Sequence, residues 1–334
     1  MPGCPMRPNS RRPGAAKARP LTVYGMDYTH LGRSGVSVSR LCLGTMNFGA
    51  ITGPEESHHI MDHALEYGIN FFDSSNTYGR PRAEGVTEQV IGSWLAGGNG
   101  RRDKVVLATK LYGGKGEWPN DQFLSAVNIR RACDDSLRRL GTDHIDLYQM
   151  HHVDRAAPWE EIWEAMQVLR AQGKIVYVGS SNLAGWHIAR AQEAARQRAM
   201  FGLVSEQSLY NLAARTVELE VLPACQGYGV GVLPWSPLHG GLLGGILRKE
   251  QGGRSAGGLA AEALAVPEVR AQIETYEALC DQLSAEPADV ALAWLLHQPA
   301  VTAPIIGPRT PAQLDGALRA LELTLDETAL GSLD

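Results

Sequence analysis

Short apolar segments alternate with longer amphipathic segments along the chain from about residue 40. Several apolar segments are apolar on both faces and are bounded by glycine or polar residues, which is typical of parallel strands covered by helices. We predict eight strands, at Leu41–Leu43, Ile69–Phe72, Val105–Thr109, Ile145–Gln149, Ile175–Val178, Leu203–Ser205, Gly231–Leu233 and Thr302–Ile306.

The segments between these strands have helical periodicity, and several carry signals for helix ends. Pro54 stands in a first turn, Gly68 follows a last turn, and Thr310 is a candidate N-cap. We predict helices over Pro54–Tyr67, Glu84–Leu95, Phe123–Leu140, Pro158–Ala171, Gly185–Arg196, Thr216–Gly227, Val269–Leu283, Pro287–Leu296 and Pro311–Leu321.

Eight β/α units within roughly 280 residues predict an α/β fold, a single (β/α)8 TIM barrel. Alternation alone also allows a doubly wound sheet, but no G-x-G-x-x-G follows the first strand. Residues 27–39 resemble a β-hairpin that could close the bottom of the barrel. The glycine-rich stretch Pro237–Leu264 is expected to be an irregular loop, of the kind that often forms a lid.

The domain organisation follows from the same pattern. Residues 26–334 are expected to form one barrel domain, because no internal repeat or linker indicates a second one. Residues 1–25 contain no hydrophobic signal-peptide region and are expected to be a disordered extension.

The composition excludes several classes of protein. With 44% hydrophobic and 20% charged residues, the 334-residue chain is typical of globular proteins, and its net charge is −5. No basic block indicates nucleic acid or a membrane surface, and no apolar run has transmembrane length. Five scattered cysteines without a C-x-x-C pair indicate free thiols and a cytoplasmic protein.

Polar or aromatic residues follow six consecutive predicted strands. Reactive residues of TIM barrels lie at such strand ends. The residues are Asp73, with Tyr78 shortly after it, then Lys110, His151 and His152, Ser180 to Asn182, Glu206 and Gln207, and Trp235 with Ser236. Each has an ordinary explanation alone, as a helix cap, a solvated strand end or a core histidine. Their convergence on one rim favours a reactive site.

These residues lie in motifs that resemble those of the aldo-keto reductase family. The motifs are D-S-S-N-T-Y-G from Asp73, A-T-K ending at Lys110, D-L-Y-Q-M-H ending at His151, V-G-S-S-N ending at Asn182, S-E-Q-S-L-Y-N from Ser205 and W-S-P-L-H-G-G from Trp235. The resemblance runs from about Tyr28 to Leu321. It is closest to the bacterial branch related to potassium-channel β subunits, which carries tryptophan at the position of Trp235.

The resemblance implies a catalytic tetrad of Asp73, Tyr78, Lys110 and His151. Carbonyl reduction leaves an oxyanion that needs a proton, and an unperturbed phenol has a pKa of about 10. We therefore expect Lys110 to lower the pKa of Tyr78, the general acid, and Asp73 to hold Lys110 charged. His151 would donate a hydrogen bond to the carbonyl oxygen, while His152 lines the substrate pocket or is structural.

The resemblance also implies an NADPH site. Ser181, Asn182 and Gln207 would bond the nicotinamide carboxamide, and Trp235 would stack on the nicotinamide ring. Four residues match the loop along the pyrophosphate, where small residues permit close approach: Ser236, Leu238, Gly240 and Gly241. The simpler interpretation of this loop is flexibility.

The segment from Ile306 to Leu314 resembles the family's 2′-phosphate and adenine site. Its matching residues are Gly307, Arg309, Thr310 and Gln313. Arg309 before a helix N-terminus can bind a 2′-phosphate with its guanidinium, which favours NADPH over NADH. Alternatively, Thr310 only caps the helix and Arg309 is solvated, and both interpretations can hold together.

The chain departs from the family pattern in three places. Gly316-Ala317 stands where many relatives have Glu-Asn, and Gly245-Ile-Leu stands for Gly-Lys-Tyr, so that Lys249 or Arg254 could substitute. The sequence ends at Asp334, without the long C-terminal loop of some relatives. Substrate specificity is therefore expected from loops near Trp118, His152, Asn211 and Pro237–Leu264.

Three functions fit these observations. The first is NADPH-dependent reduction of an aldehyde or ketone. The second is reduction of a keto or 2,3-enoyl nucleotide-linked deoxyhexose in antibiotic sugar assembly. His151 favours carbonyl reduction, because an enoyl reductase of this fold can carry glutamate there. The third is an NADPH-binding, redox-sensing regulatory subunit. No metal site is predicted, and the oligomeric state is left open.

Overall fold

Eight parallel strands form a closed barrel in the computed structural model, which describes residues 22–334 except 24, 80–83, 115, 117 and 252–258. They are β4 (Cys42–Gly44), β5 (Phe71–Asp73), β6 (Val106–Leu111), β7 (Ile145–Met150), β8 (Ile175–Ser181), β9 (Leu203–Leu209), β10 (Gly231–Trp235) and β11 (Ile305–Ile306). The sheet order runs from β10 through β4 to β11. A parallel bridge between Val232 and Val301 joins its two ends. The predicted (β/α)8 barrel is therefore confirmed.

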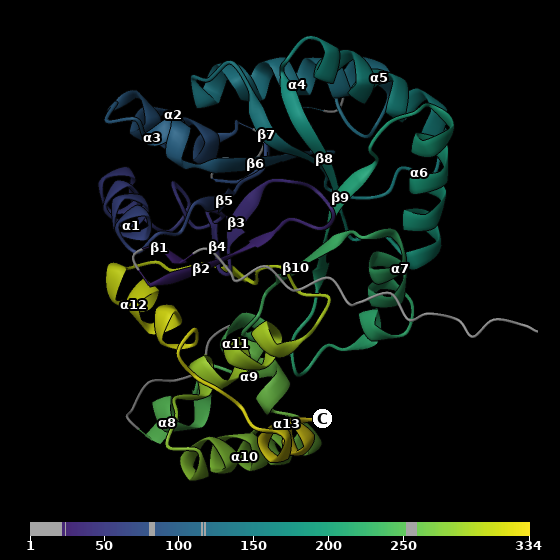
Figure 1. The fold of residues 1–334 in the computed structure, drawn as a ribbon. Coiled ribbons are helices and arrows are strands. Elements are labelled where there is room, and N and C mark those ends of the chain that lie inside the picture. The colour runs from purple at the N-terminus through teal and green to yellow at the C-terminus, as the bar shows by residue number, and fades with distance from the viewer. Residues whose placement is uncertain (1–21, 24, 80–83, 115, 117, 252–258) are drawn as a thin grey trace, which may run out of the picture.

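Helices surround the barrel (Figure 1). They are α1 (Pro54–Glu66), α2 (Val86–Ala96), α3 (Arg101–Lys104), α4 (Ala126–Leu140), α5 (Trp159–Ala171), α6 (Gly185–Gln197), α7 (Val221–Tyr228), α8 (Ile246–Gln251), α9 (Leu259–Leu264), α10 (Pro267–Gln282), α11 (Pro287–His297), α12 (Pro311–Arg319) and α13 (Glu327–Leu333). The short helices α3 and α13 were not predicted.

Three predicted helix boundaries were wrong, each for a local reason. Helix α4 begins after Ser125, whose side chain caps it, because Phe123 has a φ of 69°. Helix α2 begins after Gly85, which has a φ of 64°. The single helix predicted over 216–227 is a 3-10 turn at Thr216–Glu218 followed by α7, because Glu220 leaves the helical conformation.

An N-terminal hairpin of β2 (Met26–His30) and β3 (Ser37–Ser39) lies at the amino ends of the strands, as predicted. Arg33 N donates to Gly229 O just before β10, and Ser39 N donates to Asn70 Oδ1 just before β5. The hairpin therefore closes the bottom of the barrel. A further strand, β1 (Thr22–Val23), pairs with β2, inside the segment expected to be disordered; residues 1–21 lie outside the described residues.

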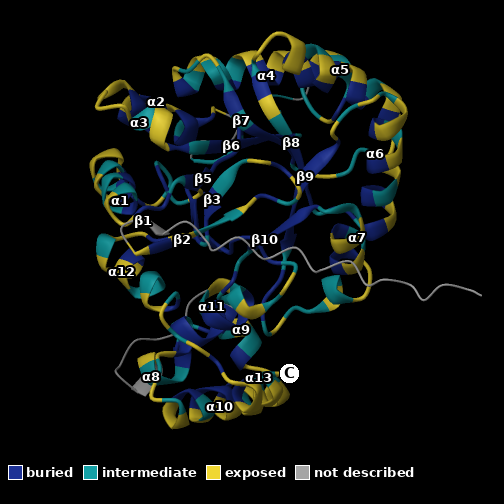
Figure 2. Cartoon of the chain, viewed as in Figure 1, coloured by how far each residue is buried: buried dark blue, intermediate teal, exposed yellow. Residues whose placement is uncertain are grey.

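Two apolar clusters stabilise the barrel, and Figure 2 shows the strands as largely buried. A smaller one fills the interior and includes Leu31 and Val38 of the hairpin region with Phe71, Leu147 and Leu233 of the strands. A larger one fills the space between the strands and the surrounding helices. Burial on both faces explains why the strands read as continuous apolar runs.

The stretch predicted to be an irregular lid is partly helical. It contains a 3-10 turn at His239–Gly241 and helices α8 and α9, with residues 252–258 outside the description. Leu242, Leu243 and Ile246 are buried in a cluster with Ile273 and Tyr276 of α10. These helices form a lobe at one side of the barrel (Figure 1).

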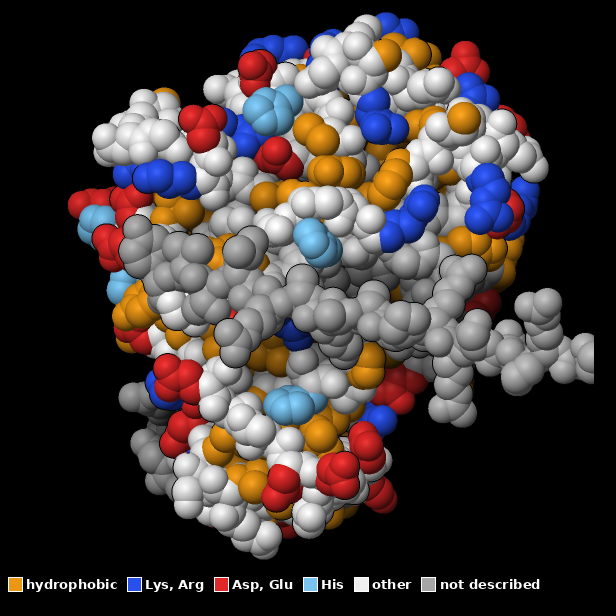
Figure 3. Space-filling view, in the orientation of Figure 1, with side chains coloured by type: hydrophobic (Ala, Val, Ile, Leu, Met, Phe, Trp, Pro, Cys, Tyr) orange, Lys and Arg blue, Asp and Glu red, His pale blue; other side chains and the backbone are white. Residues whose placement is uncertain are grey.

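Acidic and basic side chains are interspersed on the face of the molecule shown in Figure 3. Within the described ranges, no helix combines the length and the apolar character needed to cross a membrane.

Candidate active site

A buried ion pair lies at the carboxyl ends of β5 and β6. Lys110 Nζ is 2.5 Å from Asp73 Oδ2, and both side chains are almost completely buried. Lys110 Nζ also donates to Ser74 O at 2.9 Å and lies 3.1 Å from the hydroxyl of Tyr78. The ammonium thus has three oxygen neighbours: the carboxylate of Asp73, the backbone oxygen of Ser74 and the hydroxyl of Tyr78. Asp73 and Ser74 are buried, and the side chain of Tyr78 is half-buried.

The second carboxylate oxygen of Asp73 accepts two amide hydrogen bonds. Gln149 Nε2 donates to Oδ1 at 2.9 Å, and Gln207 Nε2 donates to it at 3.0 Å. Both glutamines are buried. The carboxylate is therefore fixed from three strands, β6, β7 and β9, and its orientation toward Lys110 is set by the barrel rather than by solvent.

The charge of a neighbouring group and burial shift the pKa of Tyr78 in opposite directions, and the same is true of the pKa of Lys110. Burial raises the pKa of Tyr78, Lys110 lowers it, and the net pKa lies above the ordinary value of 10.0. Lys110 thus acts on the pKa of Tyr78 in the expected direction, but burial outweighs its effect. Burial alone lowers the pKa of Lys110, but Asp73 and Tyr78 together raise it above 10.5. At neutral pH the pair is a neutral phenol beside an ammonium.

The imidazole of His151 contacts the ring of Tyr78. The two ring centroids are 5.8 Å apart in an edge-to-face arrangement. His151 Nδ1 lies 3.2 Å from Ser75 Oγ, and the ring stacks on His152 at 5.1 Å. Burial, helped by Lys110 and His152, lowers the pKa of His151 to about 3. The imidazole is therefore neutral over the physiological pH range.

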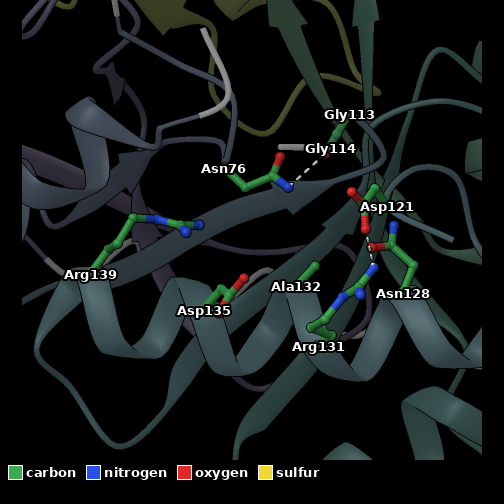
Figure 4. Close-up of a pocket in the computed structure, with 9 residues that line it drawn as sticks. All are labelled: Asn76, Gly113, Gly114, Asp121, Asn128, Arg131, Ala132, Asp135 and Arg139. Carbon is green, nitrogen blue, oxygen red and sulfur yellow. Dashed lines mark hydrogen bonds and ion pairs between the residues drawn. The ribbon is translucent and has the colours of Figure 1, made fainter. Parts of the chain in front are cut away.

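Asn76 ties the loop that carries Tyr78 to the end of β6. Its backbone N donates to Lys110 O at 3.0 Å, and its Nδ2 donates to Gly113 O at 2.9 Å. Figure 4 shows Asn76 across a small pocket from α4, whose side chains there include Arg131 and Arg139. Arg131 pairs with Asp121 and Arg139 pairs with Glu88, so this pocket is polar but internally charge-compensated.

Ser181 and Asn182 lie in a turn at the end of β8. Ser181 Oγ donates to Gln207 O at 2.8 Å. Asn182, at a φ of 58°, donates from Nδ2 to His151 O and accepts from Trp235 Nε1 at 3.1 Å. The side chain of Asn182 therefore links the imidazole-bearing strand end to the indole of Trp235.

The loop after Trp235 makes a 3-10 turn that ends in two glycines, Gly240 and Gly241. Ser236 accepts from Gly240 N through its Oγ, and Leu238 packs against the core. Gly240 and Gly241 have φ of 65° and 102°, and a Cβ at either would meet nothing within 4 Å. These conformations favour glycine, and the open space beside them permits close approach of a ligand to the backbone.

The start of α12 has a reciprocal capping arrangement. Thr310 Oγ1 accepts from Gln313 N at 3.3 Å, and Gln313 Oε1 accepts from Arg309 N at 2.8 Å. Gly307 and Arg309 are exposed, and Asn47 Nδ2 donates to Gly307 O. Thr310 therefore does cap the helix, and Arg309 directly precedes this N-cap.

The structure also gives the positions of Asn211, Lys249 and Trp118, which the sequence prediction named. Asn211 is fully buried and donates to Ser236 O, so it positions the turn after Trp235. Lys249 donates to Gly244 O at 2.6 Å and thus lies against the glycine-rich loop. Trp118 is 78% exposed, and Arg254 lies outside the described residues.

Four polar residues of this region stand in the motifs named from the sequence but were given no role there: Ser75, Asn76, Gln149 and Glu206. Gln149 had a usable signal, since it precedes His151 by two residues and therefore shares its face of the strand. Among the described residues no cluster of His, Cys, Asp or Glu could hold a metal ion.

The ion pair, the phenol and the imidazole thus lie at the carboxyl ends of the barrel strands, the face on which (β/α)8 barrel enzymes carry their active sites. The model of the aldo/keto reductase family matches residues 40–334, so the chain belongs to this family of oxidoreductases.

Three relatives illustrate the range of the family. The chain is 51% identical to the uncharacterized oxidoreductase YrpG of Bacillus subtilis, over 92% of this chain and 95% of that protein. It is 32% identical to versiconal hemiacetal acetate reductase of Aspergillus parasiticus, over 90% and 94% of the two chains. It is 33% identical to a probable voltage-gated potassium channel subunit beta of Arabidopsis thaliana, over 89% and 92%.

Proposed function

We propose that this protein is an NADPH-dependent carbonyl reductase in which Tyr78 is the general acid. The observation that carries the proposal is the position of Lys110 Nζ, 2.5 Å from Asp73 and 3.1 Å from the Tyr78 hydroxyl. An ammonium held by a buried carboxylate and directed at a neutral phenol is an arrangement for stabilising a phenolate when the phenol gives up its proton.

The residues around Trp235 would hold NADPH, which would be the source of the hydride that the carbonyl carbon receives. Tyr78 donates its proton to the carbonyl oxygen, so that the product is an alcohol and the phenol becomes a phenolate. Lys110 then lies next to a full negative charge, and the attraction between the two is strongest at that stage. The phenolate regains its proton from solvent. Asp73 is a positioning residue, because it holds Lys110 and does not itself contact the reacting groups.

His151 orients the substrate in this proposal. When the Ser75 hydroxyl donates to Nδ1, the ring proton lies on Nε2. A neutral imidazole donor beside the phenol would hold the carbonyl oxygen and favour the developing charge on it. The low pKa of His151, about 3, suits a donor that does not exchange its proton during turnover.

The residues around Trp235 fit a nicotinamide. Gln207 uses its Nε2 on Asp73, which leaves Oε1 to accept from a carboxamide NH2. Ser181 and Asn182 supply the further polar contacts, and the Trp235 ring, held by its Nε1 bond to Asn182, supplies a stacking face. The turn at Ser236, Leu238, Gly240 and Gly241 is open enough to lie along a pyrophosphate.

The preference for NADPH rests on Arg309. Arg309 is exposed and directly precedes Thr310, the N-cap of α12, and Gly307 adds no side-chain bulk. A 2′-phosphate there would gain both the positive end of the helix and a forked arginine contact. A cytoplasmic location is part of the same proposal. It is supported by the four described cysteines, all of which are free thiols.

A second candidate function is redox sensing by a regulatory subunit. The similarity to a probable potassium channel subunit beta supports it. Tight NADPH binding with almost no steady-state turnover would favour the sensor over the enzyme.

The test is an NADPH-oxidation screen over aldehydes, ketones and nucleotide-linked keto sugars, with Tyr78→Phe and the control Tyr67→Phe. Tyr67 is 40% exposed at the end of α1, away from Lys110, and its loss should leave the rate unchanged. Tyr78→Phe should lower kcat by roughly 10²–10⁴-fold, the typical contribution of a general acid. Full activity in Tyr78→Phe would overturn the proposal.

A further inference from the structure

Glu206 is a fully buried carboxyl group that the mechanism above does not use. It lies on β9 directly before Gln207, and no Lys or Arg in the described part of the chain forms an ion pair with it. Burial raises its pKa to about 7, although four hydrogen bonds act in the opposite direction. The Cys225 thiol of α7 also faces it, and burial raises the pKa of that thiol, so Cys225 is neutral. Burying an ionised carboxyl group without a neighbouring cation costs free energy, so the position of Glu206 needs a structural reason.

Glu206 contacts both ends of one turn and a serine of its own strand. Glu206 Oε1 accepts from Leu183 N at 3.0 Å and from Ser208 Oγ at 2.8 Å. Glu206 Oε2 accepts from Ser180 Oγ. Ser180 and Leu183 are the two ends of the turn at the end of β8, so one carboxyl group bridges both ends.

The middle of this turn is Ser181 and Asn182. Asn182 has a φ of 58°, a left-handed conformation that needs support from its surroundings. Asn182 N donates to Gln207 O at 2.9 Å, so β9 supports the turn through its backbone as well. Without the carboxyl group, Leu183 N and the two serine hydroxyls would lose a shared acceptor in a buried place.

We infer that Glu206 is a positioning residue for the cofactor: it fixes the turn from Ser180 to Leu183 so that Ser181 and Asn182 face the nicotinamide carboxamide. The inference rests on the proposed function, because it assigns Glu206 a role in that same site. Glu206 touches neither the substrate nor the cofactor and acts only through the turn.

A glutamine can satisfy the same three contacts. Its Oε1 accepts from Leu183 N and Ser208, and its Nε2 donates to Ser180 Oγ, whose hydroxyl can turn toward Ser205 O at 3.3 Å. An alanine satisfies none of them. Glu206→Gln and Glu206→Ala are therefore a matched pair that separates the hydrogen bonds from the charge.

The experiment measures the Kd of NADPH by quenching of tryptophan fluorescence, and it measures the KM for NADPH and the kcat by varying NADPH at a saturating concentration of a carbonyl substrate. Glu206→Ala should raise Kd and the cofactor KM at least tenfold and change kcat by less than about threefold, since the tetrad is not touched. Glu206→Gln should stay within about threefold of the wild type in all three. A merely structural role would lower the folded fraction without moving the Kd of the molecules that remain folded.

If Glu206→Ala does not fold, Ser180→Ala removes one of the three contacts and should raise Kd in the same direction by a smaller factor. An unchanged Kd in folded Glu206→Ala or in Ser180→Ala overturns the inference, as does a Kd in Glu206→Gln as weak as in Glu206→Ala. These outcomes leave the proposed function intact if the wild type binds NADPH. A wild-type protein that binds no NADPH overturns both.

Discussion

Asp73 and Lys110 form an ion pair from which solvent is almost entirely excluded, with 2.5 Å between Oδ2 and Nζ. Asp73 receives two further amide hydrogen bonds, so the carboxylate is fully satisfied without water. Of the three oxygen neighbours of the Lys110 ammonium, the Tyr78 hydroxyl is a neutral group. The attraction between Lys110 and Tyr78 therefore becomes stronger when this hydroxyl loses its proton and carries a negative charge.

Asp73→Asn should damage both activity and stability. Asparagine keeps the shape but leaves Lys110 as a buried charge without a counter-ion, and removing one partner of a buried pair costs about 3–5 kcal/mol. We expect a lower free energy of unfolding in denaturant titrations and a loss of kcat of at least 10²-fold at saturating NADPH. Wild-type kcat in Asp73→Asn would contradict the positioning role.

Asn76→Ala should lower kcat and leave cofactor binding unchanged. The substitution removes the Nδ2 bond to Gly113 O and lets the loop with Tyr78 move relative to Lys110. Displacements of about 1 Å at a reacting group can cost up to 10²-fold in rate, and we expect about tenfold. The check is kcat together with the NADPH Kd, and a changed Kd with unchanged kcat would speak against this role.

Arg309→Leu should change cofactor preference. The guanidinium has no role in binding NADH, which lacks the 2′-phosphate, so NADH serves as the internal control. Loss of a charge-assisted contact of about 1.5–3 kcal/mol predicts a rise in the KM for NADPH of roughly 10- to 150-fold. Equal effects on both cofactors would show that Arg309 does not bind the 2′-phosphate.

The neutrality of His151 predicts the acidic side of the pH profile. Burial first, and then Lys110 and His152, lower its pKa to about 3, so the ring stays neutral as the pH falls through the ordinary value of 6.5. We therefore expect kcat/KM to change in the same way between pH 7 and pH 5 in the wild type and in His151→Gln. A loss near pH 6.5 in the wild type alone would mean that His151 titrates normally.

The sequence predicted the barrel because each strand is buried on both faces. Such a strand appears in the sequence as a short run of apolar residues, which can be recognised without knowing its partners. The strand ends were less predictable. Lys110, Ser181, Gln207 and Trp235 lie within strands β6, β8, β9 and β10, and not after them, because polar residues at the rim continue the ladder. The predicted last strand was too long, since only Ile305 and Ile306 pair in β11.

The parts that the sequence could not predict depend on tertiary contacts. Leu242, Leu243 and Ile246 stand in a glycine-rich stretch that has no helical periodicity, and it becomes ordered by packing on α10. For the site, the motifs named Asp73, Tyr78, Lys110 and His151, and the structure brings their side chains together; their catalytic roles stay predictions. The partners Ser75, Gln149 and Glu206 stand in the same motifs, but the sequence did not show which group each one faces, because these contacts form only in the folded barrel.

Glu206 gives the last prediction, on stability. Its pKa rises from an ordinary 4.5 to about 7 on folding, so between these values the folded protein holds a proton that the unfolded chain has released. The free energy of unfolding therefore falls as pH rises from 4.5 to 7, by about 3 kcal/mol from this group. Glu206→Gln lacks this titration. Its melting temperature should rise relative to the wild type by a few degrees between pH 5 and pH 8, and a constant difference across that range would mean that Glu206 is ionised at both pH values.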